Sequence, residues 1–224
     1  MSAPNGHLVF LDIETGPCSA DDWAAFLESR GARDGDTPEH LAALHARTSL
    51  TGLARIASIG VAHGVECDPL VWTTEILSEI EMIDALRGWL GQSVGTARTT
   101  FVGWNVRGFD IPLLAQRALC MDRVRLARAL TGGLNSKPWD RPVLDLMDCW
   151  PSPSEERFGK NGAAVGHRRQ AEVCRRLGLP VQTGAMGADM ARCIAEGDWR
   201  AVRCHLADDV RDLQRIYEVI GGAL

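Results

Sequence analysis

Two carboxylates stand two residues apart at the end of an apolar stretch near the start of the chain. In residues 8–15, four consecutive apolar side chains lead into Asp12 and Glu14. The apolar run predicts a strand buried on both faces, and side chains two residues apart on a strand project from the same face. Two negative charges beside a core are costly unless a cation or hydrogen-bond donors offset them. The pair therefore indicates a metal site, although two solvated carboxylates at a strand end would show the same spacing.

A third carboxylate, Asp110, lies between a predicted strand at 99–104 and a predicted helix at 112–119. An aspartate at the start of a helix can cap free backbone N–H groups and meet the positive end of the helix dipole. Capping alone would explain Asp110. In the turn before it, Asn105 and Phe109 have simple interpretations as a turn former and a core residue.

The last predicted helix, 199–220, carries the fourth carboxylate. At about 100° per residue, five apolar side chains fall within about 40° of one line and define its buried stripe: Val202, Leu206, Val210, Leu213 and Tyr217. Asp209 lies at the edge of this stripe, His205 lies one turn earlier on the same side, and Asp208 is predicted to face solvent. A surface His–Asp pair would give the same pattern.

The four carboxylates share one chemistry if the strand end, the turn and the last helix converge. Four carboxylates around two Mg²⁺ ions can activate water and stabilise the leaving oxygen of a phosphodiester. A histidine beside them can orient or deprotonate that water. Motifs of other chemistries, GxSxG, GxxxxGK[ST] and HExxH, are absent from the sequence.

Three motifs in this order resemble those of the DEDD (DnaQ-like) 3′–5′ exonucleases of the ribonuclease H-like fold. The resemblance is strongest to stand-alone predicted exonucleases that are similar to the proofreading domains of family B DNA polymerases. The motifs are FLDIET at 10–15, GWNVRGFDIPLL at 103–114 and HLADDV at 205–210, and segments 144–148 and 177–180 also resemble that subgroup.

The resemblance implies an α/β, three-layer fold with a five-stranded mixed sheet, whose first three strands are antiparallel, flanked by helices. It implies a 3′–5′ exonuclease that releases nucleoside 5′-monophosphates from the 3′ end of single-stranded DNA or RNA, with DNA favoured. A polymerase or a repair enzyme is the kind of partner it suggests. Four residues would ligate two Mg²⁺ or Mn²⁺ ions: Asp12, Glu14, Asp110 and Asp209. Three more, inside the first two motifs, are predicted to contact the substrate: Thr15, Asn105 and Phe109.

The third motif departs from the family pattern at His205. The subgroup has tyrosine four residues before its last aspartate, where this chain has His205. The other branch has histidine five residues before its aspartate, but Val210 stands there and cannot bind metal. Since the helix geometry selects Asp209, we predict that His205 assists the water as a general base or only replaces the tyrosine. The alternative is a catalytically weak or inactive module that binds nucleic acid or a polymerase.

Composition and periodicity predict one globular domain, 1–224. The 224 residues are 46% hydrophobic and 24% charged, no apolar run is long enough to span a bilayer, and the seven cysteines form no CxxC pair. We therefore expect a cytoplasmic protein with reduced thiols and without structural zinc.

The predicted elements alternate along the chain. Strands are expected at 55–62, 71–75, 99–104 and 142–147, the first two forming a hairpin, and helices at 19–31, 37–47, 78–91, 112–119, 167–177, 188–196 and 199–220. The segment 121–140 is broken by glycine and proline. Residues 16–54 would be a helical insertion, either a flap beside the site or packing filler, and 151–166 a polar loop.

Charge is unevenly distributed in a chain with a net charge of −5. Residues 117–176 contain twelve basic and seven acidic side chains, so the remainder is strongly acidic. A basic middle segment could guide a nucleic-acid strand past a cluster of metal-binding acids, although solvated helix faces explain it equally well.

Overall fold

A five-stranded mixed sheet forms the centre of the computed structural model, which describes residues 7–33, 35–93, 99–134, 142–150, 169–180 and 187–220. The strands are β1 (His7–Gly16), β2 (Arg55–His63), β3 (Leu70–Thr73), β4 (Thr99–Gly103) and β5 (Val143–Asp145), in the order β3-β2-β1-β4-β5. Strands β1, β2 and β3 pair antiparallel, whereas β4 and β5 run parallel to β1. The predicted mixed sheet with three antiparallel strands is confirmed.

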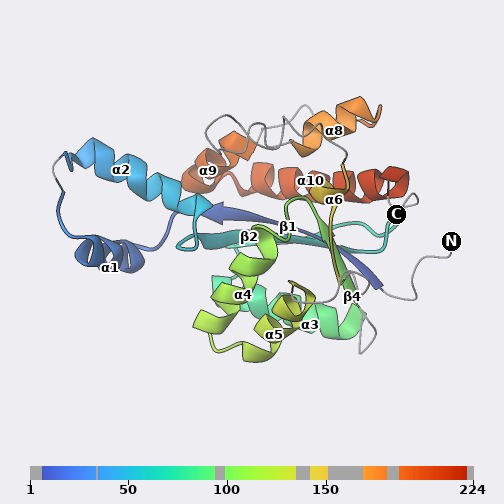
Figure 1. The fold of residues 1–224 in the computed structure, drawn as a ribbon, viewed down its shortest axis with the longest axis horizontal. Coiled ribbons are helices and arrows are strands. Elements are labelled where there is room, and N and C mark those ends of the chain that lie inside the picture. Colours follow the sequence, from blue (N-terminus) through green and yellow to red (C-terminus); the bar gives the residue numbers. More distant parts are fainter. Residues whose placement is uncertain are drawn as a thin grey trace.

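Helices cover both faces of the sheet and give three layers (Figure 1). One face carries α3 (Glu79–Ser93), α4 (Asp110–Cys120) and α5 (Val124–Leu134). The other carries α6 (Leu146–Cys149), α8 (Gln170–Arg176), α9 (Gly187–Glu196) and α10 (Trp199–Ile220). Two further helices, α1 (Ala20–Arg30) and α2 (Pro38–Arg47), project from one end of the sheet, and a short 3₁₀ helix, η1 (Thr48–Leu50), follows them.

The alternation of side chains along β1 divides the core into two layers. Val9, Leu11 and Ile13 pack in the cluster with α3, α4 and α5, whereas Phe10 packs in the cluster with α10. Because side chains of a strand alternate between its faces, Asp12 continues the row that begins at Phe10. The first two acids of the motif are therefore placed on the α10 side of the sheet.

Helix α10 lies unusually close to β2, opposite Asp12. Gly60 pairs with Asp12 across the β1–β2 ladder. A Cβ atom at Gly60 would lie 2.8 Å from Leu206 Cγ and 3.0 Å from Val210 Cγ2, so the contact requires glycine. This close approach brings the acidic edge of α10 to the end of β1.

The structure corrects three predicted elements. Strand β5 ends at Asp145 instead of 147, because the Asp145 side chain accepts a hydrogen bond from Met147 N and caps α6. Helix α5 occupies most of a segment to which we assigned no element; its apolar side chains Leu126, Ala127 and Leu130 are buried, and this packing outweighs the cost of its glycines. The helix predicted at 167–177 begins at 170, and the predicted polar loop at 151–166 lies outside the described residues.

All seven cysteines are free thiols. Within the described residues, no helix combines the length and the apolar character needed to cross a membrane.

Candidate active site

The end of β1 presents Asp12 and Glu14 toward α10. Both side chains are partly buried. The register of the β1–β2 ladder shifts between Glu14 and Thr15, which marks a bulge at this point. Bulges bend a strand and re-aim its side chains, and they are frequent beside active sites. After the bulge, Thr15 and Gly16 still pair with β2, and β1 ends at Gly16.

Asp110 reaches the same place from the other side of β1. It is the first residue of α4, only 4% exposed, and its Oδ1 accepts a hydrogen bond of 3.2 Å from Ile13 N. Ile13 lies between the two acids of β1. Asp110 therefore does more than cap a helix, because its carboxylate ties the start of α4 to the acidic end of β1.

The turn that carries Asp110 is held by a residue we did not predict to be functional, Asp145. Asp145 is 4% exposed, and its carboxylate accepts hydrogen bonds from Asn105 N at 2.9 Å, Arg107 N at 3.0 Å and Met147 N at 3.1 Å. Asn105 has a positive φ of 56° and therefore sits in the left-handed region, which asparagine tolerates. The available signal was the 144–148 segment of the family resemblance, but its function depends on backbone groups some 40 residues away.

Helix α10 supplies His205 and Asp209. His205 Nε2 lies 3.1 Å from Asp209 Oδ2 and 3.4 Å from Glu14 Oε1, and the side chains of His205 and Glu14 are 16% and 17% exposed. One ligand atom from each of these three residues lies within 4.8 Å of the others, an arrangement that could hold a metal ion. The predicted positions of His205 and Asp209 on one side of the helix agree with this geometry.

The pKa values of the four acids, Asp12, Glu14, Asp110 and Asp209, are all raised. Burial raises the pKa of Asp12, Glu14 and Asp110 well above their usual values, and the charge of Asp12 raises the pKa of the other two further. Burial raises the pKa of Asp209 to about 7, and Asp209 in turn raises the pKa of Asp12 and Glu14. An effect of one carboxylate on the pKa of another requires that the two groups lie close together.

Divalent cations match this donor set. Without a cation, the raised pKa values keep these carboxylates from ionising, whereas a divalent cation beside them stabilises the ionised form. Mg²⁺ and Mn²⁺ prefer hard oxygen ligands such as carboxylates. His205 behaves differently, because burial lowers its pKa despite the opposing charge of Asp208. Its imidazole is therefore neutral at neutral pH.

One expectation on α10 is corrected. Asp208 was predicted to face solvent, but its side chain is 28% exposed, close to the 29% of Asp209. Arg211, almost one turn later, pairs with Asp208 at 2.9 Å. The projection around a helix axis ignores a long basic side chain that folds back along the surface, and that side chain covers Asp208 here.

The three predicted substrate contacts have structural partners within the chain. The Thr15 hydroxyl donates a 2.7 Å hydrogen bond to Ser49 O, and Phe109 packs against the core. A Cβ atom at Gly108 would lie 2.5 Å from Asn105 Oδ1, so the side chain of Asn105 lies against this turn. These contacts fix the first two motifs, and the substrate roles of Thr15, Asn105 and Phe109 stay predictions.

The basic middle segment is less available than its charge suggests. Arg117 forms two hydrogen bonds of 2.7 Å with Glu79, Arg123 forms two of 2.7 Å with Asp84, and Arg176 pairs with Glu172 at 2.6 Å. Five of the twelve basic residues lie outside the described ranges: Lys137, Arg141, Arg157, Lys160 and Arg168. Part of the predicted strand-guiding charge is therefore used within the fold.

Comparisons with known proteins agree with this geometry. Residues 51–217 match the model of a family described as "Predicted 3'-5' exonuclease related to the exonuclease domain of PolB". The matched range includes Asp110 and Asp209 and begins after Asp12 and Glu14. No curated protein matches the chain.

The fold is similar to the family B DNA polymerase from the hyperthermophilic archaeon Pyrobaculum calidifontis. The TM-score is 0.58 and the sequence identity 16%, and the likeness covers 96% of this chain but only 24% of the polymerase chain. With the family match, it identifies the ribonuclease H-like architecture. The chain belongs to the family of predicted 3′–5′ exonucleases related to the exonuclease domain of PolB, in the DEDD group of ribonuclease H-like folds.

Proposed function

We propose that this chain is a two-metal-ion 3′–5′ exonuclease that removes nucleoside 5′-monophosphates from the 3′ end of single-stranded nucleic acid, with DNA favoured over RNA. One observation carries the proposal. The charges of Asp12, Asp110 and Asp209, which belong to β1, the start of α4 and α10, all raise the pKa of Glu14, as carboxylates that lie close together do. A cluster of this kind is a cost to folding, so its presence calls for a function.

Four residues would hold the two Mg²⁺ or Mn²⁺ ions: Asp12, Glu14, Asp110 and Asp209. When bound, the ions would supply Lewis-acid activation of water and charge stabilisation of the leaving oxygen. The bare acidic cluster repels the phosphates of nucleic acid. Activity should therefore depend entirely on divalent cations.

His205 would move the proton. Its Nε2 faces Glu14 and Asp209 and is neutral because burial lowers the pKa of the imidazole. A neutral Nε2 in this position can accept a proton from the attacking water. The same atom could instead orient the water or bind metal, since it belongs to the ligand-like cluster with the two carboxylates.

The test is cleavage of oligonucleotides that are labelled at either end, DNA and RNA side by side, in Mn²⁺ or Mg²⁺ and in EDTA. With a 5′ label we expect a ladder of products that shorten with time, and with a 3′ label immediate release of a mononucleotide. Asp12→Ala should lower the rate at least about 100-fold, as expected for loss of a group that holds the reacting centre.

Glu196→Gln is the matched control, because Glu196 is an exposed carboxylate of α9 whose described ion pair is with Arg192. Its rate should equal that of the wild type. Degradation that survives Asp12→Ala would belong to a contaminant and overturn the assignment. Binding without cleavage in Mn²⁺ would instead favour the non-catalytic module.

A further inference from the structure

The α1–α2 hairpin begins and ends at the edge of the sheet where the acids lie. The chain leaves β1 after Gly16, two residues beyond Glu14, and re-enters the sheet at Arg55, the ladder partner of Gly16. Two hydrogen bonds fix the base of the hairpin, from Thr15 Oγ1 to Ser49 O at 2.7 Å and from Cys18 N to Thr48 Oγ1 at 2.9 Å. The hairpin is therefore anchored beside the candidate active site.

The two helices of the hairpin contribute no buried side chain to the hydrophobic core. Neither α1 nor α2 contains a buried residue, and both helices project away from the body of the molecule (Figure 1). This exposure favours a flap beside the site over packing filler, the other interpretation that the sequence left open. Two helices ordered without core contacts are better explained by a contact with something outside the chain.

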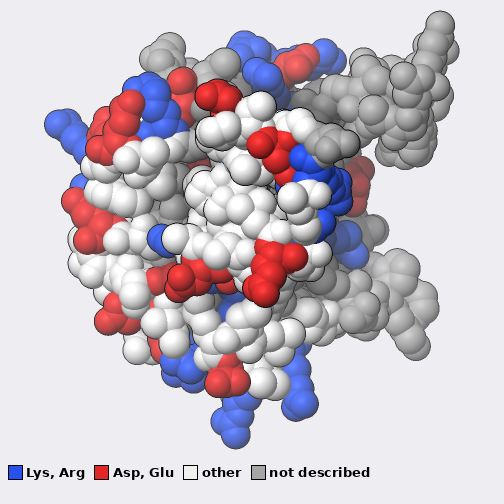
Figure 2. Space-filling model, turned by 90° about the vertical axis from the view of Figure 1, so that its left-hand side faces the viewer, with Lys and Arg blue, Asp and Glu red and all other residues white. Residues whose placement is uncertain are grey.

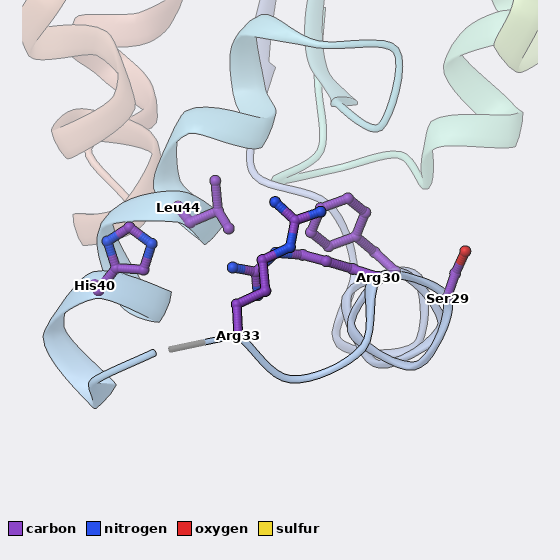
Figure 3. A pocket seen from close by; sticks show the side chains of 6 residues that line it. Ser29, Arg30, Arg33, His40 and Leu44 are labelled. Atoms are coloured by element: carbon purple, nitrogen blue, oxygen red, sulfur yellow. The ribbon is translucent and has the colours of Figure 1, made fainter. Parts of the chain in front are cut away.

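A pocket of about 450 Å³ lies between the two helices. This volume falls within the range of roughly 300–1,000 Å³ that is usual for ligand sites. Its lining combines apolar, aromatic and basic side chains: Phe26, Ser29, Arg30, Arg33, His40 and Leu44. Figure 3 shows Arg30 and Arg33 between His40 and Leu44 on one side and Ser29 on the other. The lining contains no carboxylate, and since Asp36 binds Arg30, the group left to attract an anion is Arg33.

The aromatic wall of the pocket belongs to a stack of rings. Phe26 stacks on Trp23 with ring centroids 5.3 Å apart and an interplanar angle of 19°, and Trp23 packs on His45 at 5.0 Å. The stack orients Phe26, which lines the pocket. A planar ring such as a nucleobase could extend the stack, since proteins that bind single strands commonly stack bases on aromatic side chains.

The two arginines of the pocket, Arg30 and Arg33, differ in their interactions within the chain. Arg30 is held by two hydrogen bonds to Asp36, at 2.9 and 2.7 Å, and its side chain is 9% exposed. Arg33 is exposed, and among the described residues its guanidinium has no ion pair. Seen from this end of the molecule, basic side chains are interspersed with acidic ones (Figure 2). Binding of a phosphate on this surface would therefore depend on individual groups such as Arg33.

We propose that this pocket is a second subsite for the nucleic-acid strand, in which one nucleotide upstream of the 3′ end places its base against Phe26 and its phosphate at Arg33. The inference rests on the proposed function, because it concerns the same strand. An α-helix rises about 1.5 Å per residue, so His40 lies roughly 10 Å along α2 from Arg47, the last residue of this helix. The subsite would serve strands of several nucleotides and leave a dinucleotide untouched.

Fluorescence anisotropy with 5′-fluorescein-labelled dT12 in EDTA, which prevents cleavage, measures this contact directly. Arg33→Glu should weaken binding at least about fivefold and lower the salt dependence by about one counterion. Phe26→Leu keeps an apolar side chain but removes the ring, and it should also weaken binding about fivefold or more. A labelled rU12 strand should respond to both changes in the same way.

Arg87→Glu is the matched control, since Arg87 is an exposed arginine of α3, which covers the face of the sheet opposite to α10. It should change dT12 binding less than twofold. Equal weakening by Arg87→Glu, no weakening by Arg33→Glu, or no binding of dT12 by the wild type would each overturn the proposal. Arg33→Glu is a surface change, so the test stands even if Phe26→Leu fails to fold.

Cleavage in Mn²⁺ separates the subsite from the catalytic function. With dT12 as substrate, Arg33→Glu should lower kcat/KM about fivefold, and with dT2 it should leave kcat/KM unchanged. Equal losses on both substrates would contradict a subsite upstream of the cleaved bond. If the wild type binds dT12 through Arg33 but cleaves neither substrate, the subsite stands and the exonuclease assignment fails.

Discussion

At the scale of single residues, His205 distinguishes this site from the pattern of its family. The histidine lies where the subgroup usually has tyrosine, and its Nε2 faces Glu14 and Asp209. A tyrosine hydroxyl can orient water but remains protonated at neutral pH, whereas a neutral imidazole can also accept a proton. The substitution therefore makes the pH profile of the reaction informative.

The first prediction concerns His205→Ala and His205→Tyr. If Nε2 is the base, His205→Ala should lower kcat by about 100-fold at pH 7, because general-base catalysis contributes on this order. The wild-type rate should fall with decreasing pH at values below the usual imidazole pKa of about 6.5, because burial lowers this pKa and protonation removes the base.

Rates at saturating Mn²⁺ between pH 5 and 9 check this prediction. His205→Tyr should retain measurable activity. Its rate should no longer show the decrease at low pH that protonation of the imidazole causes. A His205→Ala variant with the full rate and an unchanged profile would show that the histidine only fills the place of the tyrosine.

At the scale of elements, the turn between β4 and α4 decides where Asp110 lies. The carboxylate of Asp145, at the end of β5, accepts hydrogen bonds from backbone N–H groups of this turn and of the start of α6. Asp145 is buried, and its charge also raises the pKa of Asp110. We therefore expect Asp145 to position Asp110 through the backbone of the turn, in addition to the effect of its charge.

Asp145→Asn should therefore affect both stability and activity. An amide has one acceptor oxygen and turns its NH₂ group toward a backbone donor, so at least one hydrogen bond to a charged group is lost. We expect the free energy of unfolding to fall by about 2 kcal/mol and kcat to fall as Asp110 shifts. Urea unfolding and the cleavage assay measure the two effects.

Asp148→Asn is the control, because Asp148 is an exposed aspartate three residues later. Its effect on the free energy of unfolding should stay within about 0.5 kcal/mol, as for most surface substitutions. Equal effects of both substitutions would contradict the positioning role of Asp145.

At the scale of the whole molecule, the acidic cluster couples folding to pH and metal. The pKa of Asp209 is about 7 in the folded state, above the usual value of 3.8. Between these two values the folded state binds more protons than the unfolded state, so stability decreases as pH rises through this window. One extra proton corresponds to about 1.4 kcal/mol per pH unit.

The metal-free protein should therefore melt at a lower temperature at pH 8 than at pH 5.5. Mn²⁺ should raise the melting temperature at pH 8 more than at pH 5.5, because the cation binds ionised carboxylates of the folded state. Differential scanning fluorimetry with EDTA or Mn²⁺ measures both effects.

Asp209→Asn removes one of the mutually repelling charges and serves as the comparison. In EDTA at pH 8 it should melt at a higher temperature than the wild type, and its response to Mn²⁺ should be smaller. If the melting temperature of the wild type in EDTA rises up to pH 8, or Mn²⁺ has no effect, the acids do not form the cluster described.

Local periodicity by itself determined much of this protein. The two-residue alternation of a strand placed Asp12 and Glu14, and the 3.6-residue period of a helix selected Asp209 and His205, because both repeats are properties of the backbone. The mixed sheet followed from the family resemblance and is confirmed.

Only the tertiary structure decided the features that depend on residues far apart in the chain. Asp145 binds the backbone of the turn before Asp110. Arg211 pairs with Asp208 and shields it from solvent. Helices α1 and α2 contain no buried residue. A helical pattern shows which face is apolar, but whether that face meets the core, another helix or a ligand is set by packing between distant segments.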